Sequence, residues 1–186
     1  MQYIILGIGG QGVLFASKVL GHIALSRGHK VQASEVHGMA QRGGSVVSHF
    51  KEGDFASPLV MPGQADVILA FDQNEAVRGL EFLKPGGTLV VNIHDQEAWN
   101  NEPLQSWLKD RGAHVSALPG YRILDEHMEG KYLFMNVLIL GALAGSSAHD
   151  ATYEEMERAV AALAPAKFKE ANLKVLRLGY EAVGGK

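Results

Sequence analysis

The segment YIILGIGGQG, residues 3–12, joins an apolar run directly to four glycines. The run at 3–6 predicts a short buried strand that stops at glycine. After it, apolar residues recur at helical spacing over 11–27, and Gly28 suits the position just past a helix end. A strand, a glycine-rich turn and a helix in this order are the context in which G-x-G-x-x-G indicates a phosphate-binding loop.

The glycines of this first motif have separate roles. Gly7 permits the sharp turn, Gly9 lets the backbone come close to a ligand, and Gly12 lets the helix lie close to the strand. Together with Gly10 they leave the free N–H groups of the helix start facing an anion, usually phosphate. Gln11 adds an amide that could reach the same anion. The alternative is a tight strand–helix turn with no ligand.

The rest of the chain continues the alternation of strands and helices. Strand patterns occupy residues 30–35, 45–50, 66–71, 88–92 and 114–117. Helical patterns occupy residues 73–83, closed by a turn at 84–87, then 104–111, a segment ending at 163, and 166–183. Thr152 and Glu155 have the spacing of a capping box for the helix that ends at 163. The pattern predicts one three-layer α/β/α Rossmann-like domain over residues 1–186, with a largely parallel sheet and a mixed sheet left open.

Composition narrows the class of protein. The 186 residues are enough for one well-buried core, and 47% hydrophobic with 20% charged residues is ordinary for a globular protein. The net charge of −3 offers no basic field for nucleic acid. No apolar run reaches the ~20 residues that span a bilayer, and the start lacks signal-peptide features. We therefore expect a cytoplasmic protein that binds neither nucleic acid nor membrane.

Cysteine is absent from the sequence. Disulfides, thiolate catalysis and any cysteine-ligated iron–sulfur cluster or zinc site within this chain are thereby excluded.

A second polar, glycine-rich stretch, EVHGMAQRGGSV, covers residues 35–46. It is too rich in glycine for a helix interior and too polar for a buried strand. In an open α/β sheet it should emerge at the same carboxyl edge as the first glycine loop. Two glycine-rich loops would then flank one crevice, with the Arg42 guanidinium able to hold phosphate or carboxylate through two hydrogen bonds.

Glu35 raises a dinucleotide alternative. It lies about 20 residues beyond the glycines, where an acid binds the adenine ribose of NAD in dinucleotide-binding folds. An acidic strand end in water explains it equally well. The polar residues that follow Glu35 are more than a dinucleotide site needs.

The two motifs together, GIGGQG and EVHGMAQRGGSVVSH, resemble the gamma subunit or gamma domain of 2-oxoacid:ferredoxin oxidoreductases. The second motif is most similar to that of the small beta subunit of indolepyruvate:ferredoxin oxidoreductase. The resemblance runs over nearly the whole chain and includes ADVILAF, LKPGGTLVVN and MNVLILGAL; it is weakest over 93–129.

The resemblance implies a division of labour between chains. Such enzymes decarboxylate a 2-oxoacid on thiamine diphosphate, pass electrons through iron–sulfur clusters to ferredoxin, and transfer the acyl group to coenzyme A. The gamma part has a Rossmann-like fold and is associated with coenzyme A binding and with closure over the active site. Thiamine and the clusters would lie on partner subunits, so we expect this chain not to be catalytic alone. A homodimer of the isolated chain is left open.

Residue by residue, the resemblance and the dinucleotide alternative assign the following positions to cofactor binding: Gly7, Gly9, Gly10, Gln11 and Gly12 in the first loop, and Glu35, His37, Gln41, Arg42, Gly43, Gly44 and Ser45 in the second.

Each polar candidate also has a structural alternative. Arg42 binds a coenzyme A phosphate or the partner's site, or it forms a salt bridge that ties its loop to Glu35. His37 is an acid–base candidate, given a reference pKa near ~6.5, or an anchor for its own loop. A metal site from Glu35, His37 and His49 lacks fixed geometry, so none is expected. Asn136, in an apolar helical run, needs partners, and we expect it to fasten its helix to a neighbouring loop.

Three functions remain open at this point: a gamma-type oxidoreductase subunit, a free-standing NAD-dependent oxidoreductase, and a non-enzymatic nucleotide-binding module. The first is favoured because two independent motifs agree.

Overall fold

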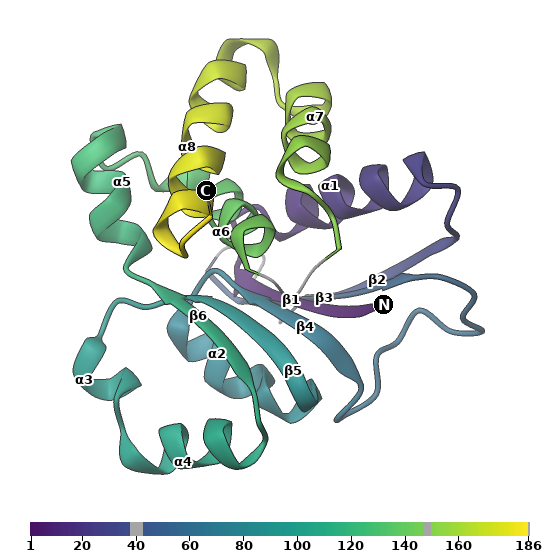
Figure 1. Cartoon of the computed structure of the whole chain (residues 1–186), viewed down its shortest axis with the longest axis vertical. Coiled ribbons are helices and arrows are strands. Elements are labelled where there is room, and N and C mark those ends of the chain that lie inside the picture. Colours follow the sequence, from purple (N-terminus) through teal and green to yellow (C-terminus); the bar gives the residue numbers. More distant parts are fainter. Residues whose placement is uncertain (38–42, 147–149, 186) are drawn as a thin grey trace.

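The computed structural model describes residues 1–37, 43–146 and 150–185. It has three layers, with a central sheet between two groups of helices (Figure 1). In the described residues the sheet has six strands in the order β2-β3-β1-β4-β5-β6. Their bounds are β1 Gln2–Ile8, β2 Val31–His37, β3 Ser45–Glu52, β4 Ala65–Ala70, β5 Leu83–Asn92 and β6 His114–Leu118.

The sheet is mixed but mostly parallel. Strands β1, β4, β5 and β6 pair in parallel, whereas β3 is antiparallel to both of its neighbours, β1 and β2. The expected α/β fold with a largely parallel sheet is therefore confirmed, in its mixed variant. Strand β3 lies between β1 and β2, so the first two strands of the chain are not neighbours.

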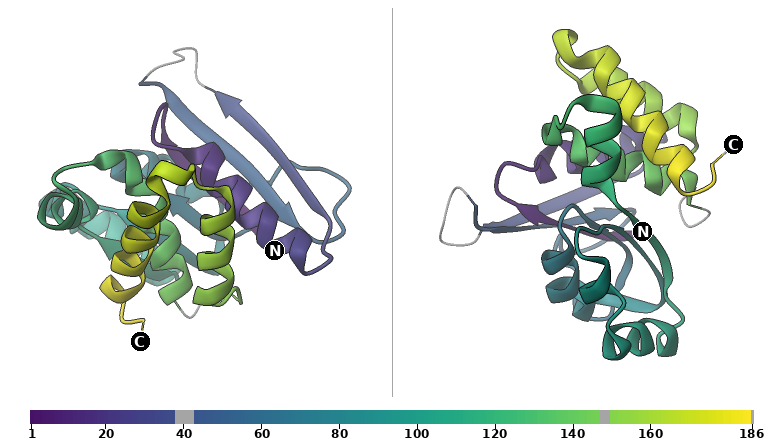
Figure 2. Two further views of the ribbon diagram at one scale, coloured as in Figure 1. Left: turned by 90° about the horizontal axis from the view of Figure 1, so that it is seen from above. Right: turned by 90° about the vertical axis from the view of Figure 1, so that its left-hand side faces the viewer.

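The helices divide between the two faces of the sheet. Helices α1 and α5–α8 cover one face, and α2, α3 and α4 cover the other, as the two turned views also show (Figure 2). The bounds are α1 Val13–Ser26, α2 Gln73–Gly79, α3 Gln96–Trp99, α4 Glu102–Asp110, α5 Gly120–Met128, α6 Met135–Gly145, α7 Tyr153–Leu163 and α8 Lys169–Ala182, with 3-10 turns η1 Leu80–Phe82, η2 Tyr132–Phe134 and η3 Ala166–Phe168.

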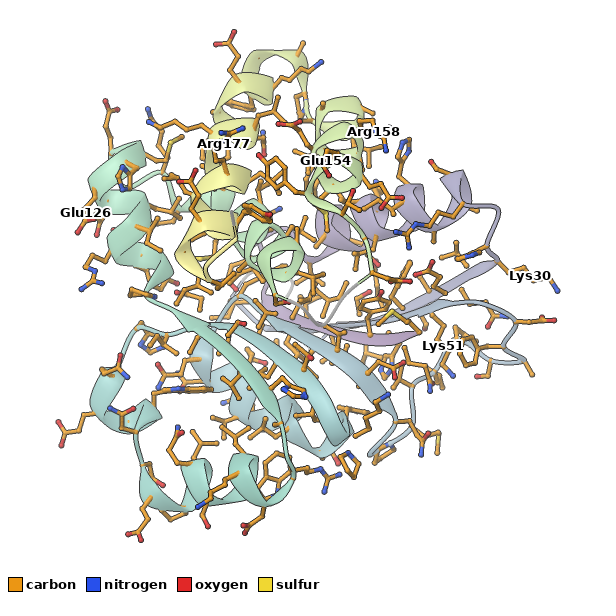
Figure 3. The ribbon with its side chains drawn as sticks, viewed as in Figure 1. Lys30, Lys51, Glu126, Glu154, Arg158 and Arg177 are labelled. Atoms are coloured by element: carbon orange, nitrogen blue, oxygen red, sulfur yellow. The ribbon has the colours of Figure 1, made fainter. Side chains whose placement is uncertain are left out.

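Each face has its own apolar core. The α1 face packs around side chains such as Tyr3, Ile5 and Leu138, and the α2 face around Ile4 and Trp99. Alternate residues of β1 thus serve opposite cores, as the period of a strand requires. Charged side chains such as Lys30, Glu126 and Arg158 project outward (Figure 3). None of the helices within the described ranges is long and apolar enough to cross a membrane.

Helix α6 is almost entirely buried and approaches α8 very closely. A Cβ atom added at Gly141 would collide with the carbonyl oxygen of Leu176, and one at Gly179 with that of Leu138. Only glycine permits two helix backbones to lie this near each other. This contact fixes α6, whose N-terminal end lies beside the first glycine loop.

Three boundary predictions need correction. The turn expected at 84–87 lies within β5, because Leu83 already pairs with Ala65 and the register shifts before Thr88 pairs with Val67. The expected helix 73–83 is the shorter α2 followed by η1, and the helix expected to begin at 166 begins as η3. Side-chain periodicity does not distinguish 3-10 from α geometry over one turn.

Candidate functional site

The candidate site lies at the carboxyl edge of the sheet, where β1, β4, β5 and β6 end and the β2–β3 connection begins. Ligands in open α/β sheets bind outside this edge, at the point where the strand order reverses. The chain leaves β1 towards β2 and β3 on one side, and β4 pairs with β1 on the other. The first glycine loop therefore occupies the switch point.

The two glycine-rich loops meet, as the sequence predicted. The Gly9 N–H donates a hydrogen bond of 2.8 Å to the Gly44 carbonyl oxygen. Directly below this bond, Ile8 pairs with Ser45 across the β1–β3 ladder. In the described residues the two loops are thus joined through backbone atoms. Gln41 and Arg42 lie outside the described residues, and of His37 only the backbone is described, which pairs with Val46.

The first loop has the backbone shape that its glycines permit. Gly10 and Gly12 have φ values of 103° and 83°, in the region that favours glycine. No atom of the described residues lies within 4 Å of a Cβ built on Gly10, so the described part of the chain leaves that side of the loop open. At Gly7, by contrast, a Cβ would lie 3.0 Å from the Gln11 side chain and 3.2 Å from the ring of Phe71. The turn is closed at its base and accessible at its tip.

Gln11 braces the loop from within. Its Oε1 accepts a hydrogen bond of 2.8 Å from the Ile8 N–H, and its own N–H donates to the Ile8 carbonyl at 3.0 Å. Burial raises the pKa of the nearby Tyr121 hydroxyl, the charge of Asp72 adds to this rise, and the Gln11 side chain partly offsets it. A contact between Gln11 and a bound anion remains a prediction.

The start of β3 is anchored through a buried carboxylate. The Ser45 hydroxyl donates to Oε2 of Glu75 at 2.5 Å, and Arg78 donates to Oε1 at 2.5 Å. Glu75 is only 4% exposed, so both of its oxygens need these partners. The root of the second glycine loop is thereby tied to helix α2.

Three helices, α1, α5 and α6, start at this edge, and none has an acidic residue in its first turn. The N–H groups of Gly120 in α5 and Val137 in α6 donate to the side-chain oxygens of Asn92 and Asn136, whereas no described side chain caps α1. Their starts touch one another. The Asn136 amide donates to the Gly12 carbonyl at 3.3 Å, and a Cβ on Gly120 would lie 2.7 Å from the Met135 sulfur. The fastening role predicted for Asn136 is confirmed, and three positive helix ends converge on one place.

Three side chains that the sequence reasoning missed complete this edge: Asp72, His94 and Tyr121. Buried Asp72 caps α2 through one oxygen, and its other oxygen lies 3.8 Å from Nε2 of His94. The ring of His94 packs 6.4 Å from that of Tyr121. They belong to no short motif. A usable signal did exist, since each follows a strand of the parallel part of the sheet.

Glu35 and His49 do not come together. Glu35 pairs with Ser48, whose hydroxyl contacts Ser17 of α1 at 3.2 Å. His49, one residue further, points to the opposite face and accepts a hydrogen bond of 3.1 Å from the Val60 N–H; burial lowers its pKa. Among the side chains that the structure describes, no group of three His, Asp or Glu residues could hold a metal ion.

Comparison with known proteins agrees with this geometry. Residues 2–182 match the pyruvate ferredoxin/flavodoxin oxidoreductase family. The indolepyruvate oxidoreductase subunit IorB of Pyrococcus horikoshii is 34% identical over 96% of this chain and 94% of its own length. The gamma subunit of a keto/oxoacid ferredoxin oxidoreductase from Geobacter sulfurreducens has a TM-score of 0.73 at 25% identity and covers 98% of this chain and 97% of its own.

A larger solved enzyme shares the fold. The 2-oxoglutarate:ferredoxin oxidoreductase of Magnetococcus marinus, with 2-oxoglutarate, coenzyme A and succinyl-CoA bound, matches with a TM-score of 0.64 at 18% identity. The match covers 98% of this chain but only 29% of that protein. The fold of residues 1–186 thus corresponds to one part of that longer chain.

Proposed function

The chain belongs to the pyruvate ferredoxin/flavodoxin oxidoreductase family and is a gamma-type subunit of a 2-oxoacid:ferredoxin oxidoreductase, and we propose that its two glycine loops bind coenzyme A. The observation that carries the proposal is the hydrogen bond from Gly9 to Gly44, which makes the two loops one rim. The start of α1, which no described side chain caps, adds backbone N–H donors next to this rim, and such donors suit phosphate groups.

The chain's own part in the reaction is binding and orientation. The backbone N–H groups at Gly10 and at the start of α1 are the proposed donors to a coenzyme A phosphate. The Arg42 guanidinium is proposed as a second phosphate ligand or as a contact to the partner subunit. Because the whole chain has no cysteine, it supplies no cluster ligand, and electron transfer to ferredoxin falls to partner chains that carry the thiamine diphosphate and iron–sulfur clusters.

For the substrate of the complex we propose an aryl pyruvate such as indolepyruvate. The support is the similarity to the Pyrococcus subunit over almost the full length of both chains. The choice of 2-oxoacid would be made mainly by the thiamine-bearing subunit.

The strand order argues against the alternative that this chain binds NAD through Glu35. Because β3 lies between β1 and β2, Glu35 is two strand spacings, about 10 Å, from β1. Glu35 of β2 pairs with Ser48 of β3, which in turn pairs with Ile5 of β1. Glu35 therefore lies beside the middle of β1, before the glycine loop begins. An acid that binds an adenine ribose needs a position beside the loop, at the end of the adjacent strand.

The test is to purify the tagged chain from its native cell without oxygen, identify its partners, and titrate the complex with coenzyme A and with NAD. We expect a large partner with thiamine and cluster motifs, and binding of coenzyme A. A chain that is recovered alone and binds NAD would contradict the proposal.

Replacing Arg42 by alanine tests the second loop in the same complex. We expect lower 2-oxoacid turnover with coenzyme A, while the far-UV circular dichroism and unfolding midpoint of the subunit stay unchanged. Replacing Lys30, an exposed residue at the opposite end of β2, by alanine is the matched control. Unchanged turnover in the Arg42 variant would refute a role for this residue.

A further inference from the structure

A small apolar hollow adjoins the first glycine loop. It has a volume of about 160 Å³ and lies between the first turns of α1, α6 and α8. Its lining residues are Phe15, Leu133, Phe134, Asn136, Pro165, Phe168 and Asn172. Asn136 connects the hollow to the loop, since the same side chain donates to the Gly12 carbonyl. A ligand held at the loop therefore has the hollow within immediate reach.

The walls of the hollow are aromatic and aliphatic. The rings of Phe134 and Phe168 meet edge to face with centroids 6.1 Å apart. At the mouth, Leu133 is 55% exposed. An exposed leucine beside an apolar concavity, next to a polar loop, is typical of a ligand site rather than of a finished core.

Two buried amides interrupt these apolar walls. Asn136 and Asn172 are each only 6% exposed. The Asn172 amide nitrogen donates to the Phe168 carbonyl at 2.8 Å, but its Oδ1 accepts no hydrogen bond from the described part of the chain. The same Oδ1 atom is not among the fully buried side-chain atoms that lack a partner, so it is accessible from the hollow. Buried polar groups normally have partners, so an acceptor left open at the hollow indicates a ligand that donates a hydrogen bond there.

The size and lining restrict what can enter. Whole-ligand pockets have volumes of roughly 300–1,000 Å³, so this hollow holds one portion of a ligand. Aromatic walls favour a flat ring, and the open amide oxygen favours a ring with an N–H donor on its edge. Adenine has both properties. The thiol end of coenzyme A must reach a reacting centre on another chain, so the nucleotide end is the one that stays on this subunit.

We propose that the hollow lined by Phe15, Leu133, Phe168 and Asn172 receives the adenine ring of the coenzyme whose phosphates lie at the glycine loop. This proposal rests on the proposed function, and adds to it which portion of the ligand is recognised and where. Asn172 accepts from the exocyclic amine of the ring, and the phenylalanine rings pack against its faces.

The test uses Leu133→Trp in the full chain, alone and in the assembled complex. Leu133 lies at the exposed mouth, so a larger side chain there blocks entry without disturbing the core. Leu25→Trp, at a 64% exposed position near the other end of α1, is the matched control. The ligands, titrated by calorimetry, are coenzyme A, adenosine 3′,5′-bisphosphate, NAD and 4′-phosphopantetheine, of which only the last lacks adenine.

We expect Leu133→Trp to raise the Kd of the adenine-containing ligands by about tenfold or more, in line with the loss of one stacked base. The Kd of 4′-phosphopantetheine and all values for Leu25→Trp should not change. If Leu133→Trp raises the Kd of NAD and the Kd of coenzyme A by the same factor, the adenine ring is the recognised group. Whichever of the two binds the wild-type protein more tightly is then the ligand that supplies this adenine.

Two results would overturn the inference while leaving the proposed function intact. One is coenzyme A binding that Leu133→Trp does not alter. The other is a Leu133→Trp variant that binds coenzyme A normally but no longer captures the thiamine-bearing partner, which would make the hollow a protein interface. Failure of the wild-type complex to bind coenzyme A would instead reject the proposed function.

Discussion

Helices α1 and α7 pack side by side on the same face of the sheet, yet they begin in opposite ways. Helix α1 begins at Gly12 with no capping side chain and no acidic residue in its first turn. Helix α7 begins with the capping box of Thr152 and Glu155, and Glu154 lies in its first turn. Glu154 lines a hollow between α7 and α8 together with Arg177 and Tyr180.

An ion pair connects the C-terminal end of α1 to the N-terminal end of α7. Arg27, just after α1, donates to both carboxylate oxygens of Glu155, at 3.0 and 2.7 Å. The start of α7 therefore lies near the end of α1, at the edge of the sheet away from the glycine loop. The protein's own side chains complete the start of α7, whereas the start of α1, beside the first glycine loop, has no such side chain among the described residues and can be completed by a ligand.

Placing a carboxylate in the glycine loop at the start of α1 should have the largest effect on coenzyme A binding. A Cβ at Gly10 meets no neighbour within the described ranges, so we expect Gly10→Asp to be accommodated, at some cost from the positive φ. Two like charges about 6 Å apart near a surface repel by about 3 kcal/mol, so we expect coenzyme A affinity to fall about 100-fold. Gly10→Asn adds the same shape without the charge and should cost much less. Equal Kd values for the two variants in calorimetric titration would argue against an anion at this position.

Removing the cap at the start of α7 should lower the stability of the protein without changing its affinity for coenzyme A. Glu155→Gln removes a charged cap and an ion pair, and we expect a loss of about 1–2 kcal/mol in the free energy of unfolding. The Kd of coenzyme A should stay the same. Urea unfolding of both proteins at pH 7, followed by circular dichroism, measures the difference.

The ion pair between Arg27 and Glu155 also makes the stability of the fold depend on pH, and the sign of this dependence can be worked out. The hydrogen bonds from Arg27 and Thr152 lower the pKa of Glu155 from 4.5 to about 2. A carboxyl whose pKa is lower in the folded state stabilises the fold above its unfolded pKa, and this contribution is lost as the pH falls towards the folded value. The stability gap between wild type and Glu155→Gln should therefore be full above about pH 5 and shrink between pH 4.5 and 2. A gap that grows in acid would contradict this account.

Loosening the second loop should give the smallest effect. Ser45→Ala removes the hydroxyl that ties the root of the loop to Glu75. A hydrogen bond to a charged group contributes about 1.5–3 kcal/mol, but Glu75 keeps Arg78 as a partner. We expect the KM for coenzyme A in the complex to rise several-fold with kcat nearly unchanged. Ser26→Ala, at an exposed serine at the end of α1, is the control, and a fall in kcat alone would show that Ser45 acts in some other way.

Local patterns were enough to predict much of the fold. The strand–glycine–helix order at 3–27 and the capping box of α7 depend on residues close in sequence, and both are confirmed. The meeting of the two glycine loops followed from a general rule about the carboxyl edges of sheets.

What could not be predicted depends on strand order and on contacts between distant segments. No local pattern shows that β3 lies between β1 and β2, and this placement is what moves Glu35 away from the glycine loop. The cluster of Asp72, His94 and Tyr121 combines three residues from three different connections. The hollow beside Asn136 likewise needs α8, more than 30 residues further along the chain, to form its far wall. The binding roles of His37, Gln41 and Arg42 remain predictions.

The glycine contact between α6 and α8 has a consequence for how this sequence can change over time. At Gly141 and Gly179 the obstacle to any side chain is a backbone carbonyl of the other helix, which no compensating exchange elsewhere can make smaller. Most core positions can drift through paired changes in volume, but these two cannot. A saturation-mutagenesis library selected for the folded chain should therefore tolerate substitutions around the neighbouring leucines and return almost only glycine at these two positions.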